Sequence, residues 1–276
     1  MHRARAMSLL FGIIVGFSLG LTGSGGSIFA VPLLVYCLAV PVHQAVVISL
    51  AAVGCTALAG ALLHWRSGAA ELHTGLIFGL AGILGAPWGA WLSGRLPAGF
   101  ILGGCAVLML LIAYRLWRQA SQNPAETQVV RASMIEPDDA GPACRRNPEG
   151  GLHLTSRCAL VLALSGVVTG VLSGLFGVGG GFLIVPALLL IAALPIRRAV
   201  ATSLLVIAII SAAGVVSHLL AGQSLDKAIT AWFVLGGLAG MGLGILLSRR
   251  LAGPLLQKLF AGMMVAVAVY MLLRNF

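Results

Sequence analysis

The sequence predicts an all-α, polytopic membrane protein made of two homologous halves. Hydrophobic residues make up 59% of the 276 residues, charged residues only 9%, and the mean hydropathy is +1.05. A soluble domain is far less apolar than this. Long apolar segments follow one another along most of the chain, and a glycine-rich motif occurs twice. We therefore expect about eight spanning helices or more, with glycine-rich broken or re-entrant helices in each half.

The apolar segments form two series of five. The first series covers residues 7–21, 27–39, 45–63, 74–93 and 100–117, and the second covers residues 157–175, 182–194, 199–220, 228–247 and 255–273. A helix needs about 20 residues to cross the hydrocarbon core, and the later segments of each series approach that length. The first two segments of each series are shorter, with a glycine cluster between them. They are predicted to form a re-entrant hairpin or a tilted, broken helix.

One copy of the repeated motif joins each pair of short segments. Residues 16–32 read GFSLGLTGSGGSIFAVP, and residues 170–186, which lie 154 positions later, read GVLSGLFGVGGGFLIVP. Glycine tolerates positive φ and proline lacks a backbone donor, so we expect a helix break in both copies, with Pro32 and Pro186 as breakers. The same register pairs Ser49 with Ser203 and His64 with His218. The chain is therefore predicted to be an internal duplication.

A polar segment separates the two halves. Residues 119–156 hold four prolines and five of the seven acidic residues, without a sustained apolar period. We expect a largely disordered, cytoplasmic linker there, between a first membrane repeat (1–118) and a second (157–276). An odd number of crossings per half would invert the halves and place both termini outside, whereas an even number would make the halves parallel. We favour inverted halves.

The numbers and positions of the charged residues, cysteines and histidines limit which functions the protein can have. The formal net charge of +10 comes mostly from residues between apolar segments or in the linker, where it sets topology and contacts anionic lipid rather than nucleic acid. The five cysteines are odd in number and show no CxxC spacing, so a disulfide framework is not expected. The six histidines are scattered along the chain. We predict neither a metal site nor a cofactor.

The doubled motif is similar to that of a known transporter family. GLTGSGGSIFAVP and GLFGVGGGFLIVP, each followed by a proline and then an Ala-Val-rich helix with a serine, resemble the sulfite exporter TauE/SafE family of membrane permeases. The resemblance covers nearly all of the chain apart from the linker. It implies secondary transport of sulfite, sulfonates or related small organosulfur anions across the bacterial inner membrane, driven by an ion gradient.

The residues of the two breaks suit an anionic substrate. Backbone amides freed at a break, and the N-termini of the helices that follow, carry partial positive charge, and nearby hydroxyls add hydrogen-bond donors. The predicted substrate-binding residues are Thr22, Gly23, Ser24, Gly25, Gly26, Ser27, Ser49, Ser173, Gly177, Gly179, Gly180, Gly181, Thr202 and Ser203. The alternative is structural: the glycines allow close helix packing and the hydroxyls bond the backbone one turn back.

Two histidines are candidates for proton coupling, because imidazole titrates near neutral pH. His64 and His218 hold equivalent positions at the ends of long apolar segments; the alternative is an interfacial side chain. No Asp or Glu lies deep in an apolar segment, which removes the usual carboxylate relay.

Two other functions compete with transport, an intramembrane serine hydrolase and a non-transporting scaffold. A hydrolase would use Ser24 or Ser173 with a histidine base. However, Ser24 pairs with Val178 in the repeat and no acidic residue is placed to orient a histidine. We predict a transporter that is not an enzyme.

Overall fold

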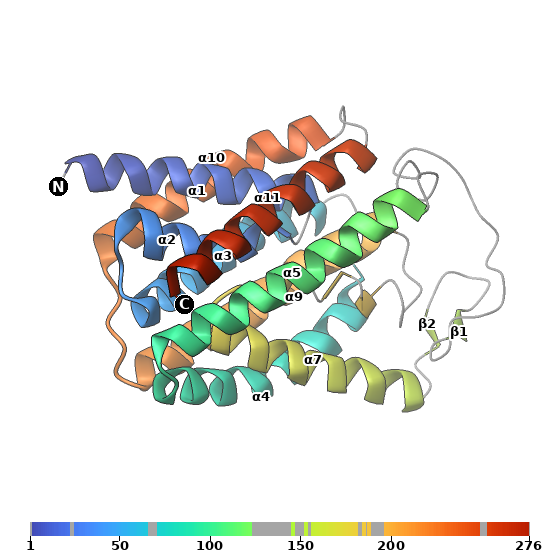
Figure 1. The fold of residues 1–276 in the computed structure, drawn as a ribbon. Coiled ribbons are helices and arrows are strands. Elements are labelled where there is room, and N and C mark those ends of the chain that lie inside the picture. Colours follow the sequence, from blue (N-terminus) through green and yellow to red (C-terminus); the bar gives the residue numbers. More distant parts are fainter. Residues whose placement is uncertain are drawn as a thin grey trace.

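The computed structural model describes residues 2–22, 25–65, 71–122, 145–146, 152–153, 156–181, 184–185, 187–188, 196–248 and 253–275. The first half contains α1 (His2–Thr22), the 3-10 helix η1 (Gly25–Phe29), α2 (Ala30–Leu38), α3 (Val42–Trp65), α4 (Leu72–Arg95) and α5 (Ala98–Gln122). The second contains α7 (Ser156–Phe176), α9 (Ile196–Leu220), α10 (Lys227–Ser248) and α11 (Gly253–Asn275). Between them, β1 (Arg145–Arg146) pairs with β2 (Leu152–His153) in antiparallel register. The all-α prediction is confirmed apart from this short pair (Figure 1).

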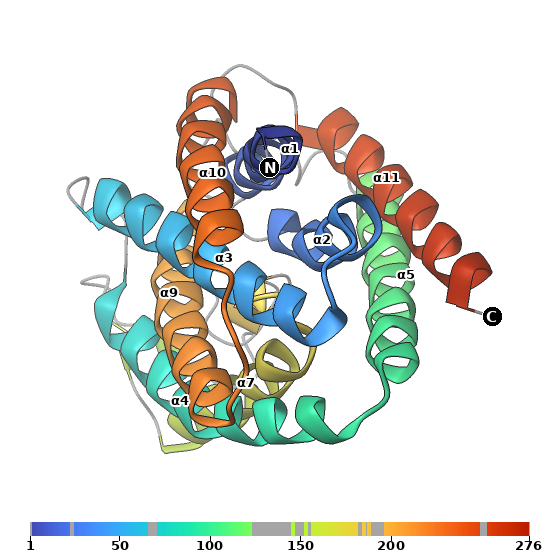
Figure 2. The same ribbon diagram turned by 90° about the vertical axis from the view of Figure 1, so that its left-hand side faces the viewer.

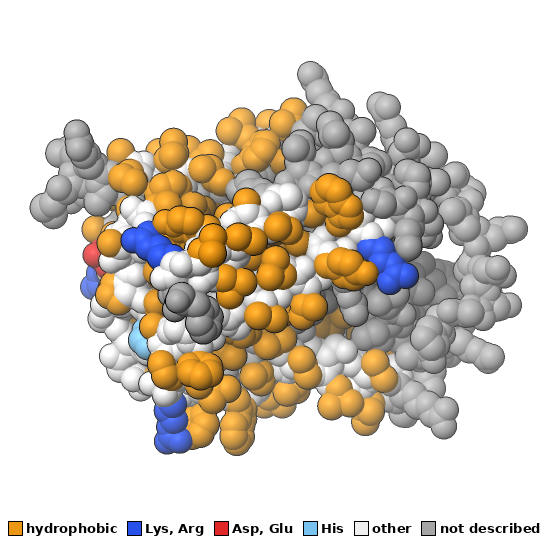
Figure 3. Space-filling view, in the orientation of Figure 1, with side chains coloured by type: hydrophobic (Ala, Val, Ile, Leu, Met, Phe, Trp, Pro, Cys, Tyr) orange, Lys and Arg blue, Asp and Glu red, His pale blue; other side chains and the backbone are white. Residues whose placement is uncertain are grey.

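Five of the described helices are long and apolar enough to cross a membrane. The candidate spans are Val42–His64, Leu72–Arg95, Cys158–Phe176, Arg198–Leu220 and Lys227–Leu247. Shorter apolar stretches cover Ala6–Leu21, Gly26–Leu38, Ala98–Tyr114 and Met264–Arg274. Hydrophobic side chains cover most of the described face in Figure 3, and Lys or Arg side chains appear at only a few places. A surface of this kind fits lipid rather than water.

Helix α4 shows how the sequence separates a lipid-facing side from a buried side. Leu80, Leu84 and Trp88 recur every four residues and are 59%, 69% and 70% exposed. This spacing places them on one helix face. Five of the six glycines of the helix lie on the opposite, buried side (Gly75, Gly79, Gly82, Gly85 and Gly89). α4 therefore presents large apolar side chains to the bilayer and a nearly bare backbone to its neighbours.

The helices of the two halves are intertwined. The most extensive helix pairs each join the first half to the second: α1 with α10, α4 with α7, α3 with α9, α5 with α11, and α4 with α9. Figure 2 shows α1 beside α10 on one side of the molecule and α4 beside α7 on the other, with α3 and α9 between these pairs. Neither half therefore forms a separate bundle.

Glycines bring the α1–α10 and α4–α7 pairs together. On α1, a Cβ added to Gly12 would lie 3.0 Å from the carbonyl carbon of Phe233, and one added to Gly16 would lie 2.6 Å from that of Gly237. On α7, a Cβ at Gly170 would lie 2.9 Å from the Cα of Gly82. Only a missing side chain allows backbones to approach this closely. These glycines, which lie outside the central glycine cluster of each motif copy, therefore serve close helix packing.

One cysteine departs from the sequence expectation. Cys158 is disulfide-bonded, whereas Cys37, Cys55 and Cys105 are free. The sequence contains no indication of a disulfide framework, because the number of cysteines is odd and no CxxC spacing occurs, and it also contains no sign of the bridge at Cys158.

Candidate functional site

The first copy of the motif turns from α1 into η1 and α2. α1 ends at Thr22, and η1 begins at Gly25. A Cβ added to Gly26 would lie 2.6 Å from the carbonyl oxygen of Val15, so η1 packs directly on the backbone of α1. Pro32 lies in the first turn of α2, where proline is tolerated because its missing N–H would have no helical partner. Ser27 is fully buried.

The second copy leaves the helical conformation through three glycines. α7 ends at Phe176, and Gly177, Gly179 and Gly180 have φ values of +70°, +69° and +69°. L-residues with side chains rarely adopt this conformation, so the sequence needs glycine here. The amide of Gly177 still donates to the carbonyl of Ser173 at 2.9 Å. We call residues 177–180 the glycine turn.

Helix α3 of the first half lies against the glycine turn of the second. A Cβ on Gly177 would lie 2.7 Å from the Cα of Val46. One turn further along, the hydroxyl of Ser49 donates to the carbonyl of Gly177 and also lies 3.3 Å from the carbonyl of Val46. Ser49, a predicted substrate-binding residue, therefore makes a hydrogen bond between the halves at the motif.

Two serine hydroxyls beside the glycine turn are buried without a hydrogen-bond partner among the described residues. They belong to Ser173 of α7 and Ser211 of α9, and both residues are 0% exposed. A Cβ on Gly179 would lie 3.2 Å from the Ser211 hydroxyl oxygen, and one on Gly180 would lie 3.6 Å from Cβ of Ser173. A buried, unbonded hydroxyl is unfavourable by about 1–3 kcal/mol. These two hydroxyls are therefore the candidate ligand-binding groups of the region.

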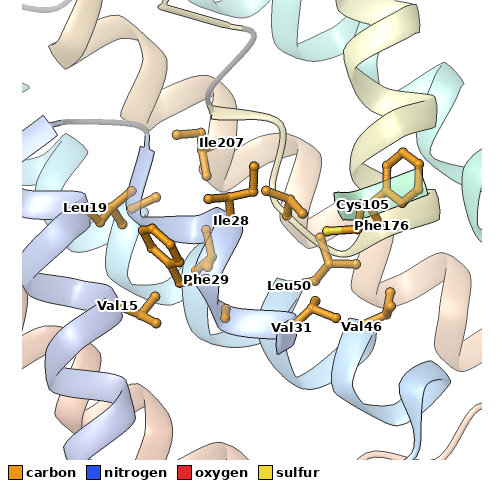
Figure 4. Close-up of a cluster of buried hydrophobic side chains, with 14 of the residues drawn as sticks. Val15, Leu19, Ile28, Phe29, Val31, Val46, Leu50, Cys105, Phe176 and Ile207 are labelled. Atoms are coloured by element: carbon orange, nitrogen blue, oxygen red, sulfur yellow. The ribbon is translucent and has the colours of Figure 1, made fainter. Parts of the chain in front are cut away.

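Apolar side chains from both halves surround this region. Ile28 of η1, Leu50 of α3, Phe176 of α7 and Ile207 of α9 belong to one buried cluster (Figure 4). A Cβ on Gly179 would also lie 2.9 Å from Val53. The hydroxyls therefore lie in an apolar surrounding between α3, α7 and α9, where a hydrogen bond or a dipole acts more strongly than in water.

The site lacks a fixed countercharge in the part of the chain that the structure describes. The buried polar side chains there belong to serines, threonines and His218, and none is Asp, Glu, Lys or Arg. The described residues also contain no group of three or more His, Cys, Asp or Glu that could hold a metal ion. Any ligand of this region would be bound by hydroxyls and backbone dipoles.

The remaining predicted residues have separate surroundings. Thr202 lies near the start of α9, where its hydroxyl accepts a hydrogen bond from the amide of Glu71 at 3.0 Å. Glu71 in turn lies 3.4 Å from Arg198 in an ion pair. Ser203 donates to the carbonyl of Val200 at 2.8 Å.

Some predicted residues lie outside the part of the chain that the structure describes. They are Gly23, Ser24 and Pro186, together with the side chain of Thr22. Gly181 is buried.

The two candidate histidines differ in what they bind. His64 Nδ1 lies 2.9 Å from the carbonyl of Gly60, one turn back on its own helix. His218 is 0% exposed, and its Nε2 lies 2.8 Å from the carbonyl of Gly174 on α7. His218 therefore links the end of α9 to the last turn of α7, three residues before the glycine turn.

Sequence reasoning found Ser173 but missed Ser211. In the repeat register Ser211 pairs with Ala57, so the duplication gave no signal for it. Only the packing of α9 against the glycine turn reveals its position.

The whole chain is similar to known membrane transporters. The sequence profile of the sulfite exporter TauE/SafE family matches residues 8–271. A probable membrane transporter protein of Xylella fastidiosa (strain 9a5c) is 32% identical over 96% of this chain and 93% of its own length. From Bacillus subtilis (strain 168), the probable membrane transporter protein YunE is 31% identical over 84% of this chain and 85% of its own, and YdhB is 28% identical over 86% and 87%. No solved structure matches the chain.

Proposed function

Because the chain belongs to the sulfite exporter TauE/SafE family and is a multi-pass membrane transporter, we propose that it carries small anions, namely sulfite, sulfonates or related organosulfur compounds. We place it in the bacterial inner membrane, with residues 119–156 as a cytoplasmic linker. It works as a secondary transporter, by alternating access around the paired glycine-rich helix ends.

The observation that carries this proposal is the pair of unbonded hydroxyls beside the glycine turn. Ser173 and Ser211 offer two donors in an apolar surrounding, and an oxyanion of the sulfite or sulfonate class has oxygens to accept both. The absence of a buried cation among the described residues suits a carrier, because a fixed charge at the site would slow release of the anion. Binding by dipoles allows both capture and release.

We infer that the two halves are inverted repeats. Helices that hold equivalent positions pack on each other, as α3 does on α9 and α5 on α11. Two further pairs are related by the same duplication. α7 is the counterpart of α1, and α4 is the counterpart of α10. α1 packs on α10, and α7 packs on α4 in the same way. In Figure 1 both chain ends lie toward one end of the molecule and the β1–β2 pair lies at the other. This arrangement supports an odd number of crossings per half.

We further propose that the helix ends at Thr22 and Phe176 are the paired breaks predicted in each repeat. In inverted-repeat transporters, discontinuous helices of the two halves meet at the substrate site near the middle of the membrane. Here η1 follows the first break and the glycine turn follows the second, and Val53 and Ile207 of equivalent helices both lie near Gly179.

The proposal is tested by flux into proteoliposomes that contain the purified protein. Labelled sulfite, sulfate and a small sulfonate are compared, with and without a pH gradient and a membrane potential. In Ser211→Ala and Ser173→Ala the KM for the transported anion should rise roughly 10- to 100-fold, because a hydrogen bond to a charged group is worth about 1.5–3 kcal/mol.

Ser217→Ala provides the matched control on the same helix. The Ser217 hydroxyl donates to the carbonyl of Ala213 at 2.8 Å, so its removal should leave KM unchanged. An unchanged KM in both Ser173→Ala and Ser211→Ala would remove the hydroxyls from the site. No flux of any anion by the wild-type protein would favour the non-transporting scaffold.

A further inference from the structure

We propose that His43 and His218 together form a proton-binding site between the two halves, and that this site couples proton movement to anion transport. The proposal rests on the proposed transport function and adds the coupling ion and its residues. The geometry that points to it is a pair of buried imidazole nitrogens without partners, one from each half.

The hydrogen bond of His218 fixes where a proton can be added. Its Nε2 lies 2.8 Å from the carbonyl oxygen of Gly174. A carbonyl only accepts hydrogen bonds, so Nε2 carries the hydrogen and Nδ1 of the neutral ring is the basic nitrogen. Nδ1 is buried and has no hydrogen-bond partner among the described residues. A proton taken up at Nδ1 would leave the bond to Gly174 intact.

His43 supplies the second imidazole from α3. Its Nδ1 is also buried without a partner in the described residues. The next residue, Gln44, donates to the hydroxyl of Ser224 at 2.9 Å, so the start of α3 lies at the end of α9 that carries His218. Two imidazolium rings so close together repel each other, so the pair holds one proton more readily than two. The pair therefore behaves as a single site that α3 and α9 share.

Other charged and titratable groups lie on the elements around this end, and two of them have partners of their own. The helices and the connection packed against α3 and α9 contribute Tyr36 and Cys37 of α2, Arg95 of α4, Cys105 of α5, Asp226 before α10 and Lys227 of α10. Arg95 stacks on the ring of Trp91 at 3.8 Å, and the carboxylate of Asp226 accepts from the amides of Ala228 and Ile229 at 2.9 and 3.1 Å. None of the described groups is hydrogen-bonded to either imidazole.

The proton site lies next to the anion site along α7. Gly174, which accepts from His218, follows Ser173, whose buried hydroxyl has no partner among the described residues. The end of α7 also carries the negative end of the helix dipole, which stabilises an imidazolium there. A proton on the pair adds positive charge beside Gly174, the residue that follows Ser173, so proton and anion should each favour the binding of the other.

The equivalent residues of the other repeat give a natural control. In the register of the duplication His43 aligns with Arg197 and His218 aligns with His64. An arginine stays charged at all physiological pH values, so that pair cannot bind and release a proton in the same way. His64 also bonds the carbonyl of Gly60 on its own helix. We therefore expect coupling at the His43–His218 end only.

The test compares His43→Gln, His218→Gln and His64→Gln in proteoliposomes with a pH indicator in the lumen. The probe anion is sulfate or a small sulfonate, whichever is transported, because both stay ionised and carry no proton of their own. We expect His43→Gln and His218→Gln to keep flux down the anion gradient at saturating anion. Both should lose the accompanying lumenal pH change and the uphill accumulation driven by a pH gradient. His64→Gln should keep the downhill flux, the lumenal pH change and the uphill accumulation.

The outcomes separate this proposal from the proposed function. Wild-type flux without a lumenal pH change would overturn proton coupling and leave anion transport standing, whereas no wild-type flux would remove the premise and the proposal with it. Proton movement that persists in His218→Gln would overturn the assignment. Loss of downhill flux in both variants would give the imidazoles a structural role. His43→Gln, at a partly exposed residue, guards against misfolding of the fully buried His218 variant.

Discussion

At the scale of single residues, the region around the glycine turn combines hydroxyls that are already bonded with hydroxyls that are not. Ser49 donates to the carbonyl of Gly177 across the interface between the halves, so its hydroxyl holds the glycine turn in place. Ser173 and Ser211 have no such bond among the described residues. We propose that the first kind of serine positions the site and that the second kind binds the anion.

The glycine turn gives a prediction that separates backbone strain from occlusion of the site. Gly179→Ala should sharply lower flux, because its methyl group would lie 2.9 Å from Val53 and 3.2 Å from the Ser211 hydroxyl. Gly222→Ala is the matched control, since its φ is +81° but nothing lies within 4 Å of its added Cβ. Both variants bear a similar strain of roughly 1–2 kcal/mol. Equal flux in the two would show that the turn does not line the site.

The sequence could predict which residue types gather at the motif but not all of their partners. Ser173 and the positive-φ glycines follow from the repeated pattern, because glycine at these positions is the only residue free of strain. Ser211 could not be predicted, since it lies 31 positions beyond Gly180 in a helix whose counterpart carries alanine. Thr202 was also predicted to bind substrate, but its hydroxyl accepts from the amide of Glu71, the residue just before α4.

At the scale of helices, glycine spacing determines how closely each pair packs. Gly240 of α10 lies against the backbone of α1, and an added Cβ would be 2.8 Å from the amide nitrogen of Phe17. Two positions further on, Gly242 has nothing within 4 Å. Backbone atoms cannot move aside as a flexible side chain can, so a methyl group on the packed side must push the helices apart.

We therefore expect Gly240→Ala to lower stability and Gly242→Ala to leave it unchanged or slightly higher. Overpacking costs about 1–3 kcal/mol, whereas alanine is a better helix former than glycine by about 1 kcal/mol. Thermal unfolding of the two variants in the same detergent measures the difference. A melting temperature that falls equally in both would mean that α1 and α10 are not in backbone contact.

The helices themselves were largely predictable, and their partners were not. Apolar segments 45–63 and 74–93 became α3 (Val42–Trp65) and α4 (Leu72–Arg95), longer by a few residues at each end. Hydropathy fixes such spans because a bilayer demands a continuous apolar helix. Nothing in that signal shows that α1 should pack on α10 rather than on its neighbours in the sequence, because small residues occur on many helices.

At the scale of the whole molecule, the main helix–helix contacts join one half to the other. α1, α3, α4 and α5 each have an extensive partner in the second half. A duplicated protein could instead have kept two independent bundles with a small interface. Here most helix–helix contacts of either half are made with the other half, so each half alone would expose its glycine-lined faces.

Expression of the halves as two chains tests this dependence. Residues 1–122 and 156–276 made separately should each be unstable in mild detergent, whereas the two expressed together should assemble and transport the anion. The physical reason is that the α1–α10, α3–α9, α4–α7 and α5–α11 contacts need both chains. Co-purification and flux measure the outcome. A first half that is stable and monodisperse by itself would contradict the intertwined arrangement.

The pairing of α1 with α10 also bears on how the protein is made. At about 5–20 residues per second, roughly 10–40 s of translation separate the end of α1 at Thr22 from the start of α10 at Lys227. During that interval the ribosome has delivered a helix whose glycine face has no partner yet. The newborn first half must then be held apart from other chains by lipid or by an insertase until the second half arrives. Folding of this transporter is thus tied to the completion of its synthesis.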